Sequence, residues 1–520
     1  SLKPAFDAMP FASITVNVQQ NSPPQNGKSA AHGVHSFIEP IITATNNACK
    51  HYENLKNSFR NNPVVLFYTY SIDSRLIQFY EYWKTRFPDR LLVKTYPSGW
   101  NNEKRQWEET GYTFTLQDLV TTLSNNKIGK LVLTNYYVFE DFLNKHQILL
   151  PPILEYLGIA CVGIDADTAE FVPNGVMMRA MFASWCNRLT AFPVLNIYWD
   201  RKYSNRNIHY VPVIQHYGST CSQVIPPQDK QMVVLSHSRA REVKAFLPFI
   251  LYILDNIDEK KVLTDLQLWF MSMRHVILNS SQLDDYTKSK HCMILFQLYY
   301  YATHFMKYET IGWVDSQYPV RIYGDDGWAT VFPEQYQNKY LSPLEIDTMF
   351  SEHQYLLLLC NICLNYLEVP GPTYDAISNG RVFINWPSLV KIKGLESLSH
   401  IEYDSKERLN NLIENIQDVY LNHGLLDAIN RLKTIMSSSE QETVEYLVKG
   451  ARFPHHVGSF FKLARQQKKL LDTLMFQYII ENREFLIKSY SSILGTDEFL
   501  YQIRDSRYFG RPYLQRLITS

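Results

Sequence analysis

A group of polar residues follows an apolar run near residue 320. The run VRIYG at 320–324 predicts a strand that ends at a glycine, and two aspartates follow it directly. A glycine at the end of a strand lets the next loop turn tightly, which allows a nucleotide base to approach closely. The residues expected to contact a nucleotide here are Tyr323, Gly324 and Asp325.

A second group of candidate ligand-binding residues opens a predicted helix after residue 370. The sequence Gly-Pro-Thr begins that helix, and Gly380 ends it. Free backbone N–H groups at such a helix start suit a diphosphate, and a carboxylate on the first turn can accept hydrogen bonds from both ribose hydroxyls. The alternative for the acidic residue is stabilisation by the helix dipole alone. The predicted nucleotide-binding residues here are Gly371, Pro372, Thr373, Tyr374 and Asp375.

Three cations follow another predicted strand, at 232–238. This strand ends in Ser-His-Ser and leads into a predicted helix over 240–256. Guanidinium groups form bidentate, charge-assisted hydrogen bonds with phosphate oxygens, so Arg239 or Arg241 is expected to clamp a diphosphate. The alternatives are a helix cap for the second serine and simple solvation for one of the cations. The candidate residues of this segment are Ser238, Arg239, Arg241 and Lys244.

Two aspartates lie at and just beyond the end of a third predicted strand, IACVGID at 159–165. In parallel sheets the carboxyl ends of the strands border the ligand crevice, so these aspartates are expected to face it. A carboxylate in that place can act as a general base or orient a hydroxyl group of an acceptor. An Asx turn leaving the strand is an equal alternative. Asp165 and Asp167 are therefore the candidate catalytic residues.

Parallel sheets are needed to bring these strand ends together, and the apolar pattern predicts them. Strands are expected at 64–70, 91–96, 130–138, 159–165, 232–238, 320–324, 356–363 and 382–386, and the first domain is expected to end with residues 207–218. Helices are expected between them, at 36–60, 74–87, 115–125, 240–256, 262–310 and 341–354, and from 406 onward. The alternation of strand and helix predicts an α/β fold built from two doubly wound domains.

The segment from Asp375 to Ile384 resembles the donor domain of GT-B glycosyltransferases. It keeps the acid-to-glycine spacing of the EA-x-x-x-G motif of the retaining members, with aspartate in place of glutamate. Glu368 lies seven positions before Asp375, where that motif has an acid eight positions before. The stretch is also similar to enzymes of the N-acetylglucosaminyltransferase V type, and the order of elements resembles the CgeB-like bacterial glycosyltransferases. The likeness covers about residues 226–430.

This resemblance implies a GT-B fold, in which two Rossmann-like doubly wound domains carry helical N- and C-terminal extensions. It implies transfer of a sugar, with retention, from a nucleoside-diphosphate sugar to an acceptor, with neither a metal nor a cofactor. Glu368 joins the donor-binding candidates. Asp325 and Asp326 also invite comparison with D-x-D metal sites. That interpretation is rejected because enzymes with D-x-D sites have a different fold and these acids follow a glycine at a strand end.

The chain is too long for one core, since single cores stop growing near roughly 250–300 residues. The expected parts are an N-terminal extension (1–60), an acceptor domain (61–225), a donor domain (226–405) with a helical insertion (262–310), and a helical C-terminal region (406–520).

Composition excludes some partners and favours one compartment. Basic and acidic residues number 51 each, whereas nucleic-acid binders usually carry a basic excess, so no nucleic-acid partner is expected. Seven scattered cysteines fit a reducing compartment, and no apolar run has the length of a membrane span. A cytoplasmic protein without a membrane span or secretory signal is therefore expected.

Two other function classes stay open. One is a non-catalytic scaffold or interaction protein with a GT-B-like core, and the other is a different nucleotide-sugar enzyme such as an epimerase. The acceptor is equally open between a protein, a glycan and a small molecule.

Overall fold

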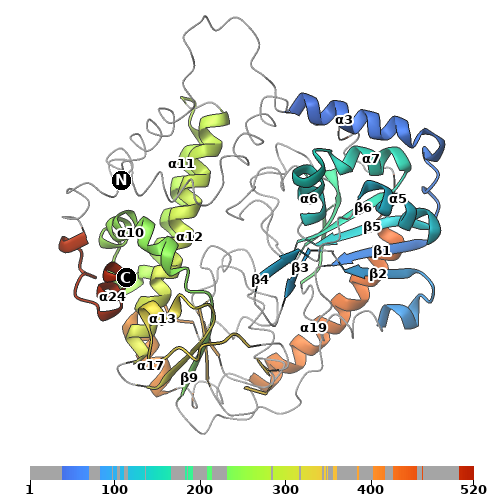
Figure 1. Ribbon diagram of the computed structural model, residues 1–520. Coiled ribbons are helices and arrows are strands. Elements are labelled where there is room, and N and C mark those ends of the chain that lie inside the picture. Colours follow the sequence, from blue (N-terminus) through green and yellow to red (C-terminus); the bar gives the residue numbers. More distant parts are fainter. Residues whose placement is uncertain are drawn as a thin grey trace, which may run out of the picture.

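Two parallel sheets and one antiparallel ribbon contain the strands of the described chain (Figure 1). The structure is a computed structural model. It describes residues 38–69, 82–95, 98–101, 106–109, 115–134, 136–165, 182–183, 185–190, 208–212, 231–282, 285–315, 318–341, 345–346, 348–349, 355–359, 383–385, 402–415, 418, 425–451, 453, 460 and 503–520.

The first sheet has six strands, each parallel to its neighbours, in the order β2-β1-β5-β6-β7-β8. Its strands are β1 (Val64–Thr69), β2 (Leu91–Thr95), β5 (Ile128–Thr134), β6 (Ala160–Asp165), β7 (Asn187–Thr190) and β8 (Ile208–Tyr210). Every residue of β6 is buried, as expected for a central strand of a parallel sheet covered on both faces. The winding reverses between β1 and β5, so these two strands flank the switch point of the sheet.

Helices and a ribbon complete the first half of the described chain. They are α3 (Ile38–His51), the short η1 (Glu53–Leu55), α5 (Leu116–Asn125), α6 (Tyr137–His146), α7 (Leu150–Leu157) and the ribbon of β3 (Ser98–Asn101) with β4 (Gln106–Glu109). Local chemistry starts α5, because Thr115 and Asp118 form a capping box. In α3, the buried hydroxyl of Thr45 accepts a hydrogen bond from Leu149 N at 2.9 Å, just before α7. This contact joins α3 to the core of the first sheet.

The second sheet has four parallel strands in the order β10-β9-β11-β12. They are β9 (Met232–Leu235), β10 (Val320–Tyr323), β11 (Tyr355–Leu358) and β12 (Phe383–Asn385). The chain leaves β9 for β10 on one side and returns for β11 on the other. The switch point therefore lies between β9 and β11, and ligands of open parallel sheets bind at such points.

Helices of very different length, from three to 31 residues, accompany the second sheet. They are α10 (Ala240–Asp255), η3 (Glu259–Lys261), α11 (Val262–Asn279), α12 (Asp285–Asp315), α13 (Trp328–Val331), α17 (Lys406–Glu414) and α24 (Pro512–Thr519). Residues of α12 such as Leu298, Phe305 and Ile311 are fully buried, because this helix lies inside the helical layer rather than on its surface. Tyr513 and Leu517 of α24 belong to the same core.

One helix reaches both cores. It consists of α19 (Leu425–Glu445) and the π-helical η5 (Tyr446–Gly450), drawn in orange across Figure 1. Its first half contributes Leu432 to the core of the second sheet, while Leu447 packs under the first sheet. Lys130 of β5 donates from Nζ to the carbonyl oxygens of Leu447 and Val448 at 3.1 and 2.6 Å. The two parallel sheets are therefore joined by a single continuous helix.

The prediction of an α/β fold with parallel sheets is confirmed, with local corrections. The strand expected over 130–138 ends at Thr134, because Tyr136 adopts a left-handed backbone (φ 61°) and α6 begins at the next residue. The helix expected over 262–310 is interrupted after Asn279. The hairpin of β3 and β4 and the strand β7 were not expected. Each expected domain boundary stays a prediction.

Candidate functional site

The loop that follows β9 ties three strand ends together. Ser236 N donates to Tyr323 O at the end of β10 at 3.1 Å, and Ser236 Oγ donates to Leu359 O after β11 at 3.2 Å. This loop, Ser236–Arg239, is called the switch loop because it lies at the switch point between β9 and β11. The predicted nucleotide contact Tyr323 is partly buried against the core, and its carbonyl serves this junction.

Two glycines allow the β10–α13 loop to approach the switch loop. A Cβ on Gly324 would lie 2.0 Å from Ser236 O, and one on Gly327 would lie 2.2 Å from Ser238 Oγ. Trp328 Nε1 donates to Ser236 O at 2.7 Å across the same contact. Gly324 was expected to allow a nucleotide base to approach closely, but the segment that approaches it in the structure is the switch loop.

Asp325 holds the switch loop from the side. Its carboxylate accepts hydrogen bonds from Ser238 N at 2.8 Å and from the Ser238 hydroxyl, and its Oδ2 lies 3.5 Å from His237 Nδ1. Burial alone would raise the pKa of Asp325, but the hydrogen bonds from His237 and Ser238 outweigh it and hold that pKa below its ordinary value. Asp325 is therefore an ionised residue that positions the loop.

The three predicted cations lie in different surroundings. Arg239 is half-buried and hydrogen-bonds to Tyr300 of α12, whereas Arg241 and Lys244 are exposed on α10. Arg239 has a left-handed backbone (φ 53°) as the N-cap residue of α10, so Ser238 is not that residue. The Nε of Arg239 is buried without a hydrogen-bond partner among the described residues. Of the three, Arg239 lies in the switch loop itself.

Helix α12 brings further polar side chains to the same place. Lys307, which is 3% exposed, donates from Nζ to Ser236 Oγ at 2.7 Å. The Nδ1 of buried His304 lies 3.0 Å from His237 O, and since a carbonyl only accepts, this nitrogen carries a proton. Burial, and then the charges of Lys307 and Arg239, hold the pKa of His304 well below its ordinary value, so its ring is neutral.

These α12 residues, and their neighbours at the switch loop, were missed in the sequence. The missed residues are His237, His304, Lys307, Tyr308, Trp328 and Tyr340. A usable signal existed, because His304, Lys307 and Tyr308 are spaced i, i+3 and i+4 and so share one face of a helix that is otherwise mostly apolar.

Asp165 occupies a different environment from the one expected. Its side chain has no exposed surface, and Arg188 Nε donates to its Oδ2 at 2.6 Å. Tyr136, whose ring covers Gly163 on β6, donates from its hydroxyl to Oδ1 at 3.1 Å. Asp165 was expected to face an acceptor as a catalytic base. Both oxygens are buried and hydrogen-bonded within the protein, so the surroundings differ from those expected, and the catalytic role stays a prediction.

The remaining candidates lie outside the described residues and stay predictions. They are Asp167, Glu368, Gly371, Pro372, Thr373, Tyr374 and Asp375. The strand β12 that follows them is described and pairs with β11, next to the switch point.

Comparison with known proteins adds no assignment, since no family model, no curated protein and no solved structure matches this chain. Within the described ranges, His, Cys, Asp and Glu side chains form no group of three that could hold a metal ion. No helix in those ranges is long and apolar enough to span a bilayer. Cys49, Cys161 and Cys186 are buried, and none of these three cysteines is in a disulfide bond.

Proposed function

We propose that this protein is a glycosyltransferase and that the switch loop of the second sheet binds the diphosphate of a nucleoside-diphosphate sugar. The observation that carries the proposal is that Lys307 bonds Ser236 of the switch loop, that Arg239 lies in the same loop, and that both cations act on His304 at the switch point of a parallel sheet. Two cations beside a helix N-terminus favour a multiply charged anion.

The surroundings of the switch loop favour a diphosphate over a singly charged anion. The side chain of Arg239, at the N-cap position, forms no capping hydrogen bond, and Ser238 Oγ accepts from Ala240 N only at 3.4 Å. Lys307 is buried, and a charge in a low-dielectric site interacts strongly with an anion brought beside it. In the proposed reaction these cations stabilise the departing diphosphate, and no divalent metal takes part.

The finer arrangement belongs to the same proposal. The second sheet would hold the donor and the first would receive the acceptor, as in the GT-B enzymes that the sequence resembles. Asp375 would bind the donor ribose, and the sugar would be transferred with retention. The helix formed by α19 and η5 contributes residues to the cores of both sheets, which supports the proposal that the two sheets act together on donor and acceptor.

Sugar release from the donor tests the activity and its independence of metal. A panel of nucleoside-diphosphate sugars is incubated with the wild-type protein, with and without excess chelator, and free sugar is measured by mass spectrometry. We expect slow hydrolysis of one donor that persists in chelator, because the cations in the proposed site belong to the protein.

The control is the same panel with heat-inactivated protein. Hydrolysis that stops in chelator and returns with manganese would contradict the metal-independent mechanism and direct attention to Asp325 and Asp326 as ligands.

A further inference from the structure

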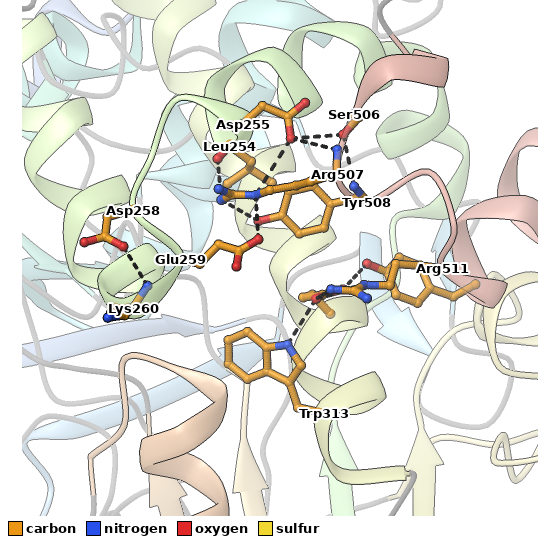
Figure 2. A network of polar contacts seen from close by, with 12 residues as sticks. Leu254, Asp255, Asp258, Glu259, Lys260, Trp313, Ser506, Arg507, Tyr508 and Arg511 are labelled. Atoms are coloured by element: carbon orange, nitrogen blue, oxygen red, sulfur yellow. Dashed lines mark hydrogen bonds and ion pairs between the residues drawn. The ribbon is translucent and has the colours of Figure 1, made fainter.

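The segment 503–520, called the docking segment, contacts α10, which follows the switch loop, α13, which follows the loop after β10, and α12, which supplies side chains to the switch loop. It packs on α10 and α13, and two of its residues bind Glu309 of α12. Figure 2 shows these contacts around Arg507 and Arg511. The docking segment thus lies beside helices of the candidate site although it is more than 180 positions further along the chain, as the contact of Arg516 with Val331 shows.

Glu309 is the centre of the contact with α12. This carboxylate is 3% exposed, and Arg511 donates to it from Nη2 at 3.0 Å and from Nε at 3.2 Å. The hydroxyl of Tyr513 and Trp313 Nε1, the latter at 3.1 Å, donate to the same group. Burial raises the pKa of Tyr513 well above its ordinary value, so the phenol stays a donor. Glu309 therefore holds Tyr513 at a fixed place beside α12.

Two arginines fix the far ends of the other helices. Arg507 donates from Nη2 to Leu254 O, in the last turn of α10, at 2.6 Å, and Ser506 Oγ donates to Asp255 at 3.1 Å. Arg516 donates from Nη1 to Val331 O, the last residue of α13, at 3.0 Å. Cations at helix C-termini are favourable because they meet unpaired carbonyls and the negative end of the dipole.

The ring of Tyr513 packs with Tyr308, which hydrogen-bonds to the switch loop, and with Phe332. Its centroid lies 6.0 Å from that of Tyr308 and 5.9 Å from that of Phe332. Tyr308 donates from its hydroxyl to Ser238 O, and its ring lies edge-on to Trp328, 5.6 Å away. Trp328 in turn donates to the carbonyl of Ser236. The ring of Tyr513 thus supports two of the donors to the loop backbone, Tyr308 directly and Trp328 through Phe332, whose ring centroid lies 6.2 Å from that of Trp328.

We infer that Tyr513 is a positioning residue for the switch loop, acting through Tyr308 and Trp328. Loss of the Tyr513 ring leaves space into which Tyr308 and Phe332 can move, and the hydrogen bond to Ser238 O loosens with them. The consequence for nucleotide binding rests on the proposed function, whereas the consequence for the loop itself does not.

Hydrogen exchange of backbone amides measures the loop directly. In Tyr513→Leu, a peptide covering 236–243 is expected to exchange at least about tenfold faster than in the wild type. Tyr513→Phe keeps the ring but loses the hydrogen bond to Glu309, so exchange in this peptide should rise less than in Tyr513→Leu. Leu517→Ala, a buried change in the same helix without a ring contact to Tyr308, is the matched control and should leave this peptide unchanged.

Titration with nucleoside diphosphates gives the second readout. Tyr513→Leu should weaken binding by about tenfold relative to Leu517→Ala, because small displacements of binding groups are costly. If Tyr513→Leu does not fold, Arg511→Ala, which removes a largely exposed partner of Glu309, should give a smaller increase in exchange of the same peptide.

Equal exchange in Tyr513→Leu and Leu517→Ala, or no change in Arg511→Ala, would overturn the inference. Faster exchange in a protein whose wild type binds no nucleotide would uphold the positioning role and reject the proposed function. The two claims therefore fail separately.

Discussion

Replacing Arg188 by methionine is expected to lower the free energy of unfolding by about 3–5 kcal/mol, because it leaves a buried carboxylate without its charge partner. Arg188 and Asp165 have side-chain exposures of 3% and 0%, and their atoms Nε and Oδ2 lie 2.6 Å apart. Denaturant unfolding followed by circular dichroism measures the change.

The control for Arg188 is an exposed pair in the same sheet region. Arg86 pairs with Glu445 of α19 at 2.9 Å, but its side chain is 43% exposed. Arg86→Met should lower the free energy of unfolding far less than Arg188→Met does, because solvent screens an exposed ion pair. Equal losses in the two variants would contradict the prediction that burial makes the Arg188–Asp165 pair the more important of the two for stability.

Gly324→Ala is the second change with a large expected effect. The added Cβ would lie 2.0 Å from Ser236 O and 2.7 Å from Trp328 Nε1, inside the contact between the switch loop and the β10–α13 loop. Overpacking of this kind costs about 1–3 kcal/mol of stability, and here it also displaces the residues proposed to bind the diphosphate. Thermal unfolding and nucleotide titration measure the two losses.

Gly510 provides the matched control for Gly324. A Cβ at Gly510 would meet no atom within 4 Å, so Gly510→Ala should leave both stability and nucleotide binding close to the wild type. A folded Gly324→Ala protein with unchanged nucleotide affinity would place the ligand away from the switch loop.

The strands of both sheets were predictable where burial alone defines them. The continuous apolar runs that became β1 and β9 mark strands covered on both faces. Strand β7 was not predictable in this way, because it contains the polar residues Asn187 and Arg188. Their side chains are buried only because β6 supplies partners, as Asn187 Nδ2 donates to Cys161 O at 3.2 Å. The residues next to β7 in the sequence do not indicate that such a partner exists.

The site was predictable to the extent that strand ends define it. The rule that carboxyl ends of parallel strands meet brought Ser238, Arg239 and Asp325 together correctly. Lys307 and His304 come from a long helix that looks like core, and only the tertiary packing of α12 places them at the switch loop. The surroundings of Asp165 were not predictable either, because its partners Arg188 and Tyr136 come from other parts of the chain.

Calorimetric titration of nucleoside diphosphates tests the central claim most directly. We predict that the wild-type protein binds one of them, that Arg239→Gln weakens this binding by about tenfold or more, as for a lost charge-assisted hydrogen bond, and that Lys244→Gln, an exposed cation five residues further along the chain, changes it by no more than about twofold. Absence of binding to the wild type, or equal affinities in Arg239→Gln and Lys244→Gln, would contradict a diphosphate site at the switch loop.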